Sequence, residues 1–218
     1  MASARETILW RVRRATGDVP EGERPEDVPV ERGYRERDDA PREEVVDRFA
    51  ENVAEYEATV HRVEEAGLSG LIREILERRG LRHLVVPSGL PEAWVPENVE
   101  VLRDGGDGQL SNEELDTSDG VLTGCALGIS QTGTIVLDSG PGQGRRALTL
   151  LPDYHLCVVR EDQVVGLVPE AFAGLEEVVS GEGRPVTFIS GPSATSDIEL
   201  NRVEGVHGPR VLEVLIVG

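Results

Sequence analysis

Two carboxylates and a cluster of hydroxyl groups lie between the last two apolar runs of the sequence. The segment SGPSATSDIE, residues 190–199, holds Asp197 and Glu199, which point the same way if the chain is extended there. Carboxylates so placed can act as a general base, as a nucleophile or as acceptors for substrate hydroxyls. The alternative is a serine-rich turn that caps a helix and leaves its acids in water. The segment's candidate ligand-binding residues are Gly191, Pro192, Ser193 and Thr195.

A histidine between glycines follows in GVHGPRVL, residues 205–212. His207 is predicted to lie in a loop, where a ligand can reach it and where an imidazole can transfer protons near neutral pH. Gly208 and Arg210 are candidate ligand-binding residues, and Arg210 could pair with an anionic ligand or with the two carboxylates. A structural turn, in which Arg210 only neutralises those acids, explains the same residues.

The third segment is SQTGTIVLDSGPGQGRR, residues 130–146, in which a glycine between two threonines interrupts a strand pattern. Such a glycine marks a bulge or the close approach of a ligand or another backbone. Downstream, Arg145 and Arg146 could close over an anion; a hairpin with a solvated tip is the alternative. Metal-binding spacings such as HxxxH are absent, so no metal site is predicted. The candidate ligand-binding residues are Thr132, Gly133, Thr134 and Arg145.

Composition excludes several classes of function. The 218 residues carry a formal net charge of −19, which disfavours nucleic acid as a partner. No window is apolar enough for a membrane span, and the N-terminal residues lack the apolar core of a signal peptide, so we expect a cytoplasmic protein. Cys125 and Cys157 are too few to hold an iron–sulfur cluster, and their apolar surroundings predict buried, unreactive thiols.

The N-terminal part of the sequence predicts helices joined by a polar arm. Apolar spacing predicts a short helix over 4–15, and the charged, proline-rich residues 16–40 predict a flexible tether. A long helix is predicted from Pro41 to Gly67, and a second, capped by Ser69, ends at Gly80. The predicted domain organisation is therefore an arm, residues 1–40, and a single domain, residues 41–218.

The rest of the chain alternates apolar strands with helices. Strands are predicted over 82–87 and 99–104, then a capping box joins Ser111 to Glu114, and several short strands follow. A last helix precedes the closing strands, which include VTFIS and VLEVLIV. This order predicts an α/β fold with a mainly parallel sheet covered on both faces. Residues 190–199 would follow a strand of that sheet, at the carboxyl end where such sheets bind ligands.

Four motifs together resemble the LUD-domain family, in its group of lactate-utilisation C proteins (LutC/YkgG). They are found at Thr132–Thr134, Leu150–His155, Gly191–Glu199 and Gly205–Pro209, within a resemblance that covers about 41–218. Gln131 stands where many members of the family have glutamate. The arm has no counterpart in the family pattern.

The resemblance implies a Rossmann-like layered fold of the NagB/RpiA/CoA-transferase-like group. It also implies a cluster-free subunit that oxidises L-lactate to pyruvate together with iron–sulfur partner proteins. It names no cofactor and leaves open whether this chain is itself an enzyme. Two alternatives remain: a free-standing enzyme on a sugar phosphate or acyl-CoA with Asp197 or Glu199 as base or nucleophile, and a module that binds a small anionic metabolite. All three readings expect the three segments to meet at one concave site.

Overall fold

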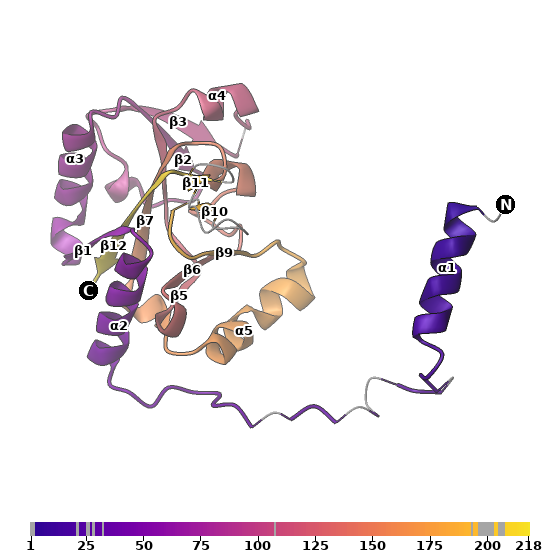
Figure 1. Ribbon diagram of the computed structural model, residues 1–218. Helices are drawn as coiled ribbons and strands as arrows, with labels where there is room; N and C mark the ends of the chain where they lie inside the picture. Colours follow the sequence, from indigo (N-terminus) through magenta and orange to yellow (C-terminus); the bar gives the residue numbers. More distant parts are fainter. Residues whose placement is uncertain are drawn as a thin grey trace. The chain divides into compact units, whose positions relative to one another are not determined.

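The chain forms two units, residues 1–35 and 36–218. The computed structural model describes residues 3–20, 22–24, 27, 29–31, 33–106, 108–192, 194–195, 203–204 and 208–218. The first unit contains helix α1 (Ala4–Ala15), as the apolar spacing predicted (Figure 1). A capping box starts this helix: the Ser3 hydroxyl accepts from the Glu6 amide at 3.2 Å, and the Glu6 carboxylate accepts from the Ser3 amide at 2.7 Å.

A six-stranded parallel sheet forms the centre of the second unit. Its strands lie in the order β1, β12, β7, β4, β2, β3, and every neighbouring pair is parallel. This confirms the prediction of an α/β fold with a mainly parallel sheet. The strand bounds are β1 (Thr59–Val63), β12 (Val211–Val217), β7 (Tyr154–Arg160), β4 (Gly120–Thr123), β2 (His83–Pro87) and β3 (Glu100–Asp104).

One face of this sheet is covered by α3 (Leu68–Arg79). Ile72 and Ile75 of the helix pack in one core with Leu156 and Leu215 of the central strands, and all four side chains are fully buried. The helix ends at Gly80, whose left-handed conformation (φ 69°) closes the last turn as the sequence predicted.

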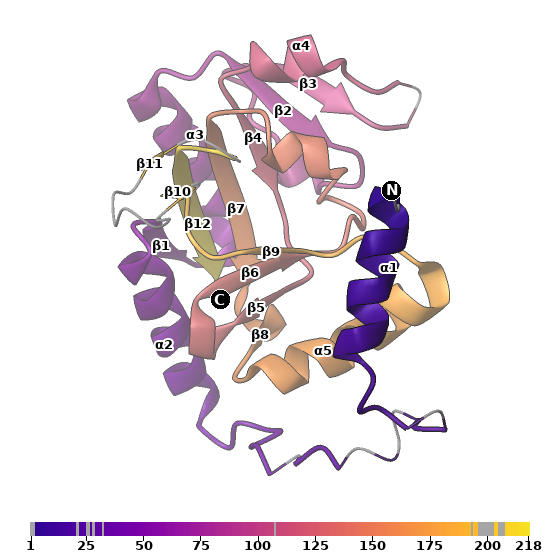
Figure 2. The ribbon, with the colours of Figure 1, turned by 45° about the vertical axis from the view of Figure 1, so that its right-hand side comes forward.

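The opposite face carries α2 (Arg42–Glu55) and a second, smaller sheet of order β8, β5, β6, β9. Phe49 of α2 packs with Cys157, Val214 and Ile135, which joins helix, main sheet and small sheet in one core. Helix α5 (Val168–Glu177) lies against the outer side of the small sheet (Figure 2). The small sheet consists of β8 (Val164–Val165), β5 (Leu127–Ile129), β6 (Thr134–Leu137) and β9 (Thr187–Ile189).

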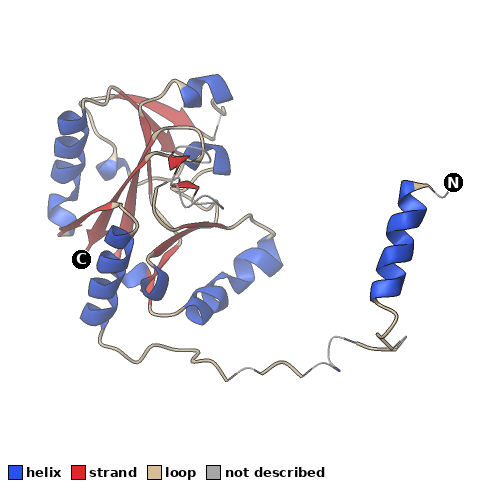
Figure 3. Cartoon of the chain, viewed as in Figure 1, coloured by secondary structure: helices blue, strands red, loops and turns tan. Residues whose placement is uncertain are grey.

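Short elements complete the second unit (Figure 3). Helix α4 (Asn112–Asp116) starts with the predicted capping box between Ser111 and Glu114. A 3-10 turn, η5 (Arg146–Thr149), precedes β7, and a turn of π-helix, η7 (Val178–Glu182), follows α5. Strands β10 (Ala194–Thr195) and β11 (Val203–Glu204) form an antiparallel pair. The remaining 3-10 turns are η2 (Glu65–Gly67), η3 (Glu92–Trp94), η4 (Ser130–Thr132) and η6 (Glu161–Gln163).

The predicted long helix from Pro41 to Gly67 is wrong in its second half. The helix stops at Glu55, and Glu57 adopts a left-handed conformation (φ 67°) that an α-helix cannot continue through. The residues that follow form β1, which pairs along its whole length with β12. Valines at helical spacing also suit a strand, and the pairing partner lies about 150 residues away in the sequence, so the local pattern could not decide.

The strand before residues 190–199 also lies in a different sheet from the one predicted. This strand, β9, belongs to the small sheet and runs antiparallel to β6. The rule that places ligands at the carboxyl ends of parallel strands therefore does not apply to it. The last polar residue before the turn, Ser190, instead faces the amino-terminal ends of β7 and β12, as described below.

A buried carboxylate connects four elements on the α3 face of the main sheet. Glu213 of β12 is fully buried, and its Oε1 accepts hydrogen bonds from His61 at 2.6 Å and from Arg78 at 3.2 Å. Its Oε2 accepts from Arg79 at 2.6 Å and from the Tyr154 hydroxyl at 3.0 Å. Burial alone would raise the pKa of Glu213, but the hydrogen bonds from Arg79 and His61 lower it, so the carboxylate stays charged.

Candidate functional site

A small cavity lies where η5 and the start of β7 meet the end of β9 and the start of β12. Its volume is about 190 Å³, and we call it the small cavity. Its polar lining consists of Arg146, Thr149, His155 and Ser190, and no carboxylate lines it among the residues the structure describes. Its other lining residues are Phe188, Ile189, Leu212, Gly191, Pro192, Gly208 and Pro209.

This position joins residues of all three predicted segments, because Arg146 belongs to the third, residues 130–146. Gly191 and Pro192 come from the first segment and Gly208 from the second, and all three line the same cavity. The site is at the amino-terminal ends of β7 and β12, whose second residues, His155 and Leu212, form part of its wall.

The histidine of the cavity is held by the neighbouring strand. His155 has 1 % of its surface exposed, and its Nε2 lies 2.8 Å from the hydroxyl of Thr123 on β4. Thr123 itself is fully buried, so the imidazole is fixed by a partner that solvent cannot replace. The ring of His155 also acts on the thiol of Cys157, two residues further along the same strand.

The cation of the cavity is fixed by its own 3-10 turn. Nη1 of Arg146 donates to the carbonyl of Thr149 at 2.8 Å and to its hydroxyl at 3.1 Å. The remaining guanidinium nitrogens have no carboxylate partner among the described residues, whereas Arg145 next to it does. In a protein with a net charge of −19, a guanidinium with no carboxylate partner among the described residues is a candidate site for an anion.

The threonine–glycine–threonine segment, residues 132–134, contacts one of the residues that line the cavity. The hydroxyl of Thr134 lies 2.8 Å from that of Ser190, a lining residue, and 2.7 Å from that of Thr132. The backbone that approaches Gly133 is that of α2: a Cβ built there would lie 2.5 Å from the carbonyl carbon of Asn52. The third predicted segment thus reaches the cavity directly through Arg146, and indirectly through the contact of Thr134 with Ser190. Its glycine packs against the backbone of α2.

Arg145 lies in a second, larger cavity of about 660 Å³, which we call the large cavity. Its guanidinium binds the carboxylate of Asp104 at 2.9–3.3 Å and the carbonyl of Leu110. Arg146 borders both cavities, and Arg184, paired with Asp138 and Glu182, borders only the large one. The large cavity opens at the carboxyl ends of β2 and β3.

The remaining predicted residues fall in three groups. Arg210 is exposed and lies 3.6 Å from Asp153, so the partner that the structure describes is a carboxylate that the sequence did not suggest. Thr195 belongs to β10, and its side chain is outside the description. The predicted residues outside the described part of the chain are Ser193, Asp197, Glu199 and His207.

Of the four polar residues that line the cavity, the sequence alone marks only Arg146, as a side chain that could close over an anion. His155 lies in the apolar run YHLCVV, which is typical of a buried strand. A buried imidazole needs a hydrogen-bond partner, so this position is a signal in the sequence for a structural or functional role. Arg146 is expected, together with Arg145, to close over an anion, but no local pattern tells which of these two adjacent arginines forms an ion pair. Thr149 had no signal at all.

Two thiols lie beneath the histidine. A hydrogen bond from Cys125, supported by His155 and Thr123, lowers the pKa of the Cys157 thiol, while the same hydrogen bond and burial raise the pKa of Cys125. Both cysteines are free and buried, as predicted. In the parts of the chain that the structure covers, no three His, Cys, Asp or Glu side chains gather into a group that could hold a metal ion.

This burial predicts how the thiols react. We expect a bulky aromatic disulfide reagent to modify neither Cys125 nor Cys157 in the native protein, and to modify both in denaturant, because only a thiolate that solvent can reach will react. Absorbance of the released thiolate measures both rates. Fast modification of Cys157 without denaturant would contradict the described packing, since its side chain is fully buried.

The fold and the site together define an α/β protein with a parallel sheet and a small polar cavity at one end of its central strands. The chain matches the LUD domain over residues 46–217 and therefore belongs to the LUD-domain family, which confirms the resemblance seen in its motifs. Among the described residues, no helix is long and apolar enough to cross a membrane.

Two lactate-utilisation proteins match along almost the full chain. Lactate utilization protein C from Deinococcus radiodurans is 47 % identical over 219 residues, which cover 100 % of this chain and 97 % of that protein. Lactate utilization protein C from Halalkalibacterium halodurans is 29 % identical and covers 96 % of this chain and 95 % of that protein. A crystal structure of a DUF162 family protein from Deinococcus radiodurans has a TM-score of 0.72 and 45 % identity, covering 82 % of this chain and 99 % of that chain.

Proposed function

We propose that this chain is a cytoplasmic, cluster-free subunit of a lactate-utilisation system that converts L-lactate to pyruvate together with iron–sulfur partner proteins. The observation that carries the proposal is the 47 % identity, over the whole chain, to a protein named Lactate utilization protein C. The small cavity supports it, because a subunit of such a system needs a site for a small anion. The proposed ligand-binding residues are those of the three segments that line or support this cavity, with Asp197, Glu199 and His207 as proposed catalytic groups.

The proposed reaction needs electron acceptors that this chain does not carry by itself. Oxidation of a 2-hydroxy acid to a 2-oxo acid removes two electrons and two protons from the substrate. An iron–sulfur cluster takes about four cysteine ligands, and this chain has two cysteines, both buried in one core region. Partner proteins that carry clusters would therefore accept the electrons, while this chain would contribute the binding of a small anion.

The test is association and electron transfer with the candidate partners. The iron–sulfur proteins encoded next to this chain's gene are co-expressed with it and purified through a tag on this chain. We expect a complex whose clusters are bleached by L-lactate and remain oxidised with D-lactate. The proposal fails if the partners oxidise L-lactate at the same rate without this chain, or if no complex forms at any ratio of the proteins.

A second candidate function is supported by the large cavity. With a volume of about 660 Å³ and three arginines in its wall, it has room for a larger anion, and it lies at the carboxyl ends of β2 and β3, the usual ligand position in open parallel sheets. A free-standing enzyme on a sugar phosphate or an acyl-CoA, with Asp197 or Glu199 as base or nucleophile, would use such a site. Turnover of these substrates, abolished by Asp197→Asn, would support it.

A further inference from the structure

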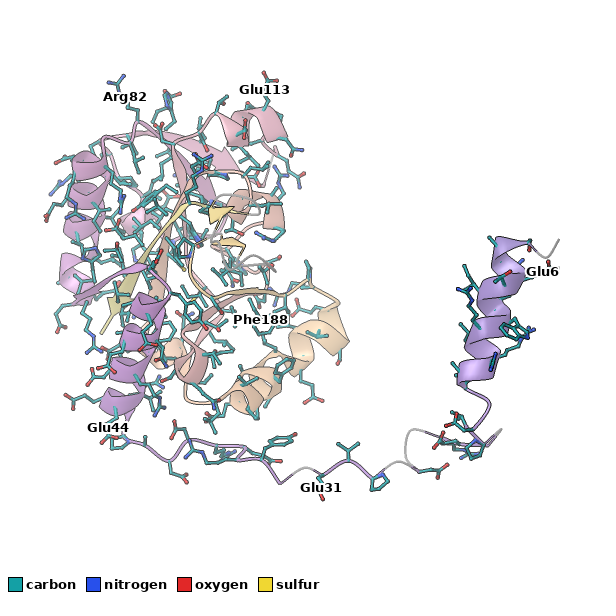
Figure 4. The ribbon with its side chains drawn as sticks, viewed as in Figure 1. Glu6, Glu31, Glu44, Arg82, Glu113 and Phe188 are labelled. Atoms are coloured by element: carbon teal, nitrogen blue, oxygen red, sulfur yellow. The ribbon has the colours of Figure 1, made fainter. Side chains whose placement is uncertain are left out.

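The lining of the small cavity is divided between polar and apolar groups. Arg146, Thr149 and His155 come from η5 and β7, whereas Phe188 and Ile189 come from β9 and Leu212 from β12. Phe188, labelled in Figure 4, also stacks on Phe172 of α5, with ring centroids 5.9 Å apart. A ligand that fills this space needs a charged or polar end and an apolar remainder.

The volume limits the size of that ligand. A water molecule takes about 30 Å³ of liquid volume, so a cavity of about 190 Å³ has room for a molecule of a few carbon and oxygen atoms. Inorganic phosphate would fit, but it would leave the apolar wall formed by Ile189 and Leu212 without a contact.

The polar groups are arranged for one anionic end with a neighbouring substituent. Among the described residues, Thr149 holds the guanidinium of Arg146 through Nη1, so its other N–H groups can bind a carboxylate. His155 offers a second polar group, fixed by Thr123 at 2.8 Å, and Ser190 offers a third. These groups can bind a hydroxyl or oxo oxygen beside the carboxylate.

We propose that the small cavity binds a short monocarboxylate with a hydroxyl or oxo group next to the carboxylate, and that Arg146 is its anion-binding residue. The carboxylate lies against Arg146 and Thr149, the neighbouring oxygen against His155 or Ser190, and the short carbon chain against Ile189 and Leu212. This inference rests on the proposed function, since lactate and pyruvate belong to the class, but it concerns the isolated chain and can be tested without any partner.

The experiment is calorimetric titration of the purified full chain with L-lactate, pyruvate, propionate and inorganic phosphate. L-lactate or pyruvate should bind, propionate more weakly because it lacks the second oxygen, and phosphate more weakly than either. Arg146→Gln should lower the affinity for L-lactate about tenfold or more, because a hydrogen-bonded charge is lost. Thermal unfolding of each variant shows that the fold is retained.

Two matched arginine variants locate the ligand. Arg184→Gln removes a guanidinium that borders only the large cavity, and Arg103→Gln removes an exposed one that pairs with Glu92. Both should keep the affinity of the wild-type chain within about twofold, the usual size of surface effects. Loss of binding in Arg184→Gln but not in Arg146→Gln would move the ligand to the large cavity and overturn the proposal.

The remaining outcomes are also decisive. Phosphate that binds as tightly as L-lactate would show a general anion site and overturn the ligand class. Absence of binding by every acid, with the chain folded, would overturn the proposal while leaving the proposed function open, because the partners could complete the site. Binding without any complex with iron–sulfur partners would support the inference and count against the proposed function.

Discussion

Replacing Glu213 by alanine is expected to lower the free energy of unfolding by about 3–5 kcal/mol, the usual cost of removing one member of a buried ion pair. The carboxylate is fully buried and accepts four hydrogen bonds, two of them from Arg79 and His61 at 2.6 Å. Without it, Arg79 loses its anionic partner, and the Tyr154 hydroxyl loses its acceptor. Urea unfolding followed by circular dichroism measures the change.

The control for this prediction is Glu92→Ala. Glu92 is largely exposed and pairs with the exposed Arg103 at 2.8 Å, so its loss should cost less than about 1 kcal/mol. Equal effects of the two substitutions would contradict the account of the Glu213 network.

The Glu213 network also predicts how stability depends on pH. The pKa of Glu213 is lower in the folded chain than its ordinary value of 4.5, because the hydrogen bonds from Arg79 and His61 outweigh burial. The stabilisation is therefore present above the unfolded-state pKa and is lost as the pH falls through the folded-state pKa. The stability difference between wild type and Glu213→Ala should shrink as the pH is lowered below about 4.5. A difference that grows on acidification would contradict this sign.

Replacing Gly133 by alanine is expected to destabilise the chain by about 2–4 kcal/mol, from overpacking together with a left-handed backbone. Gly133 has φ 57°, and a Cβ there would lie 2.5–2.7 Å from backbone atoms of Asn52 and Val53 in α2. The Asn52 amide donates to the Ser130 carbonyl at 2.8 Å, so the helix and the loop cannot separate without losing this bond. Thermal or urea unfolding gives the measurement.

Gly70→Ala is the matched control for Gly133→Ala. Gly70 lies in α3 with no heavy atom within 4 Å of a built Cβ, so alanine should stabilise the helix by about 0.5–1 kcal/mol. If Gly133→Ala were tolerated as well as Gly70→Ala and only ligand binding were lost, the glycine would serve a ligand and its packing against α2 would be irrelevant.

The sequence predicts an element correctly where residues close together in the chain determine its start or end. The capping box of Ser111 and Glu114, the end of α3 at Gly80 and the helix over 4–15 all follow from chemistry within one or two turns. Elements that depend on distant partners were not predictable in the same way. The residues of β1 are predicted as the end of a helix, because their valines also fit helical spacing. The strand forms only through pairing with β12, which is distant in the sequence.

The candidate site shows the same limit. The sequence marked Gly191, Pro192 and Gly208, and these line the small cavity, because turn chemistry can be seen in a local pattern. The sequence does not show the surroundings of His155 and Arg146, because these depend on the fold. His155 is held by Thr123 on the adjacent strand. Arg146 has no carboxylate partner among the described residues. The sheet that holds β9 could not be inferred either, because strand order is a property of the whole fold.

The most direct test of the central claim is a crystal structure of the full chain grown with saturating L-lactate. We expect the ligand in the small cavity, with its carboxylate bound by the guanidinium of Arg146 and its hydroxyl within hydrogen-bond distance of His155 or Ser190. Lactate bound in the large cavity, against Arg184, or a small cavity filled only by water at saturating ligand, would contradict the account.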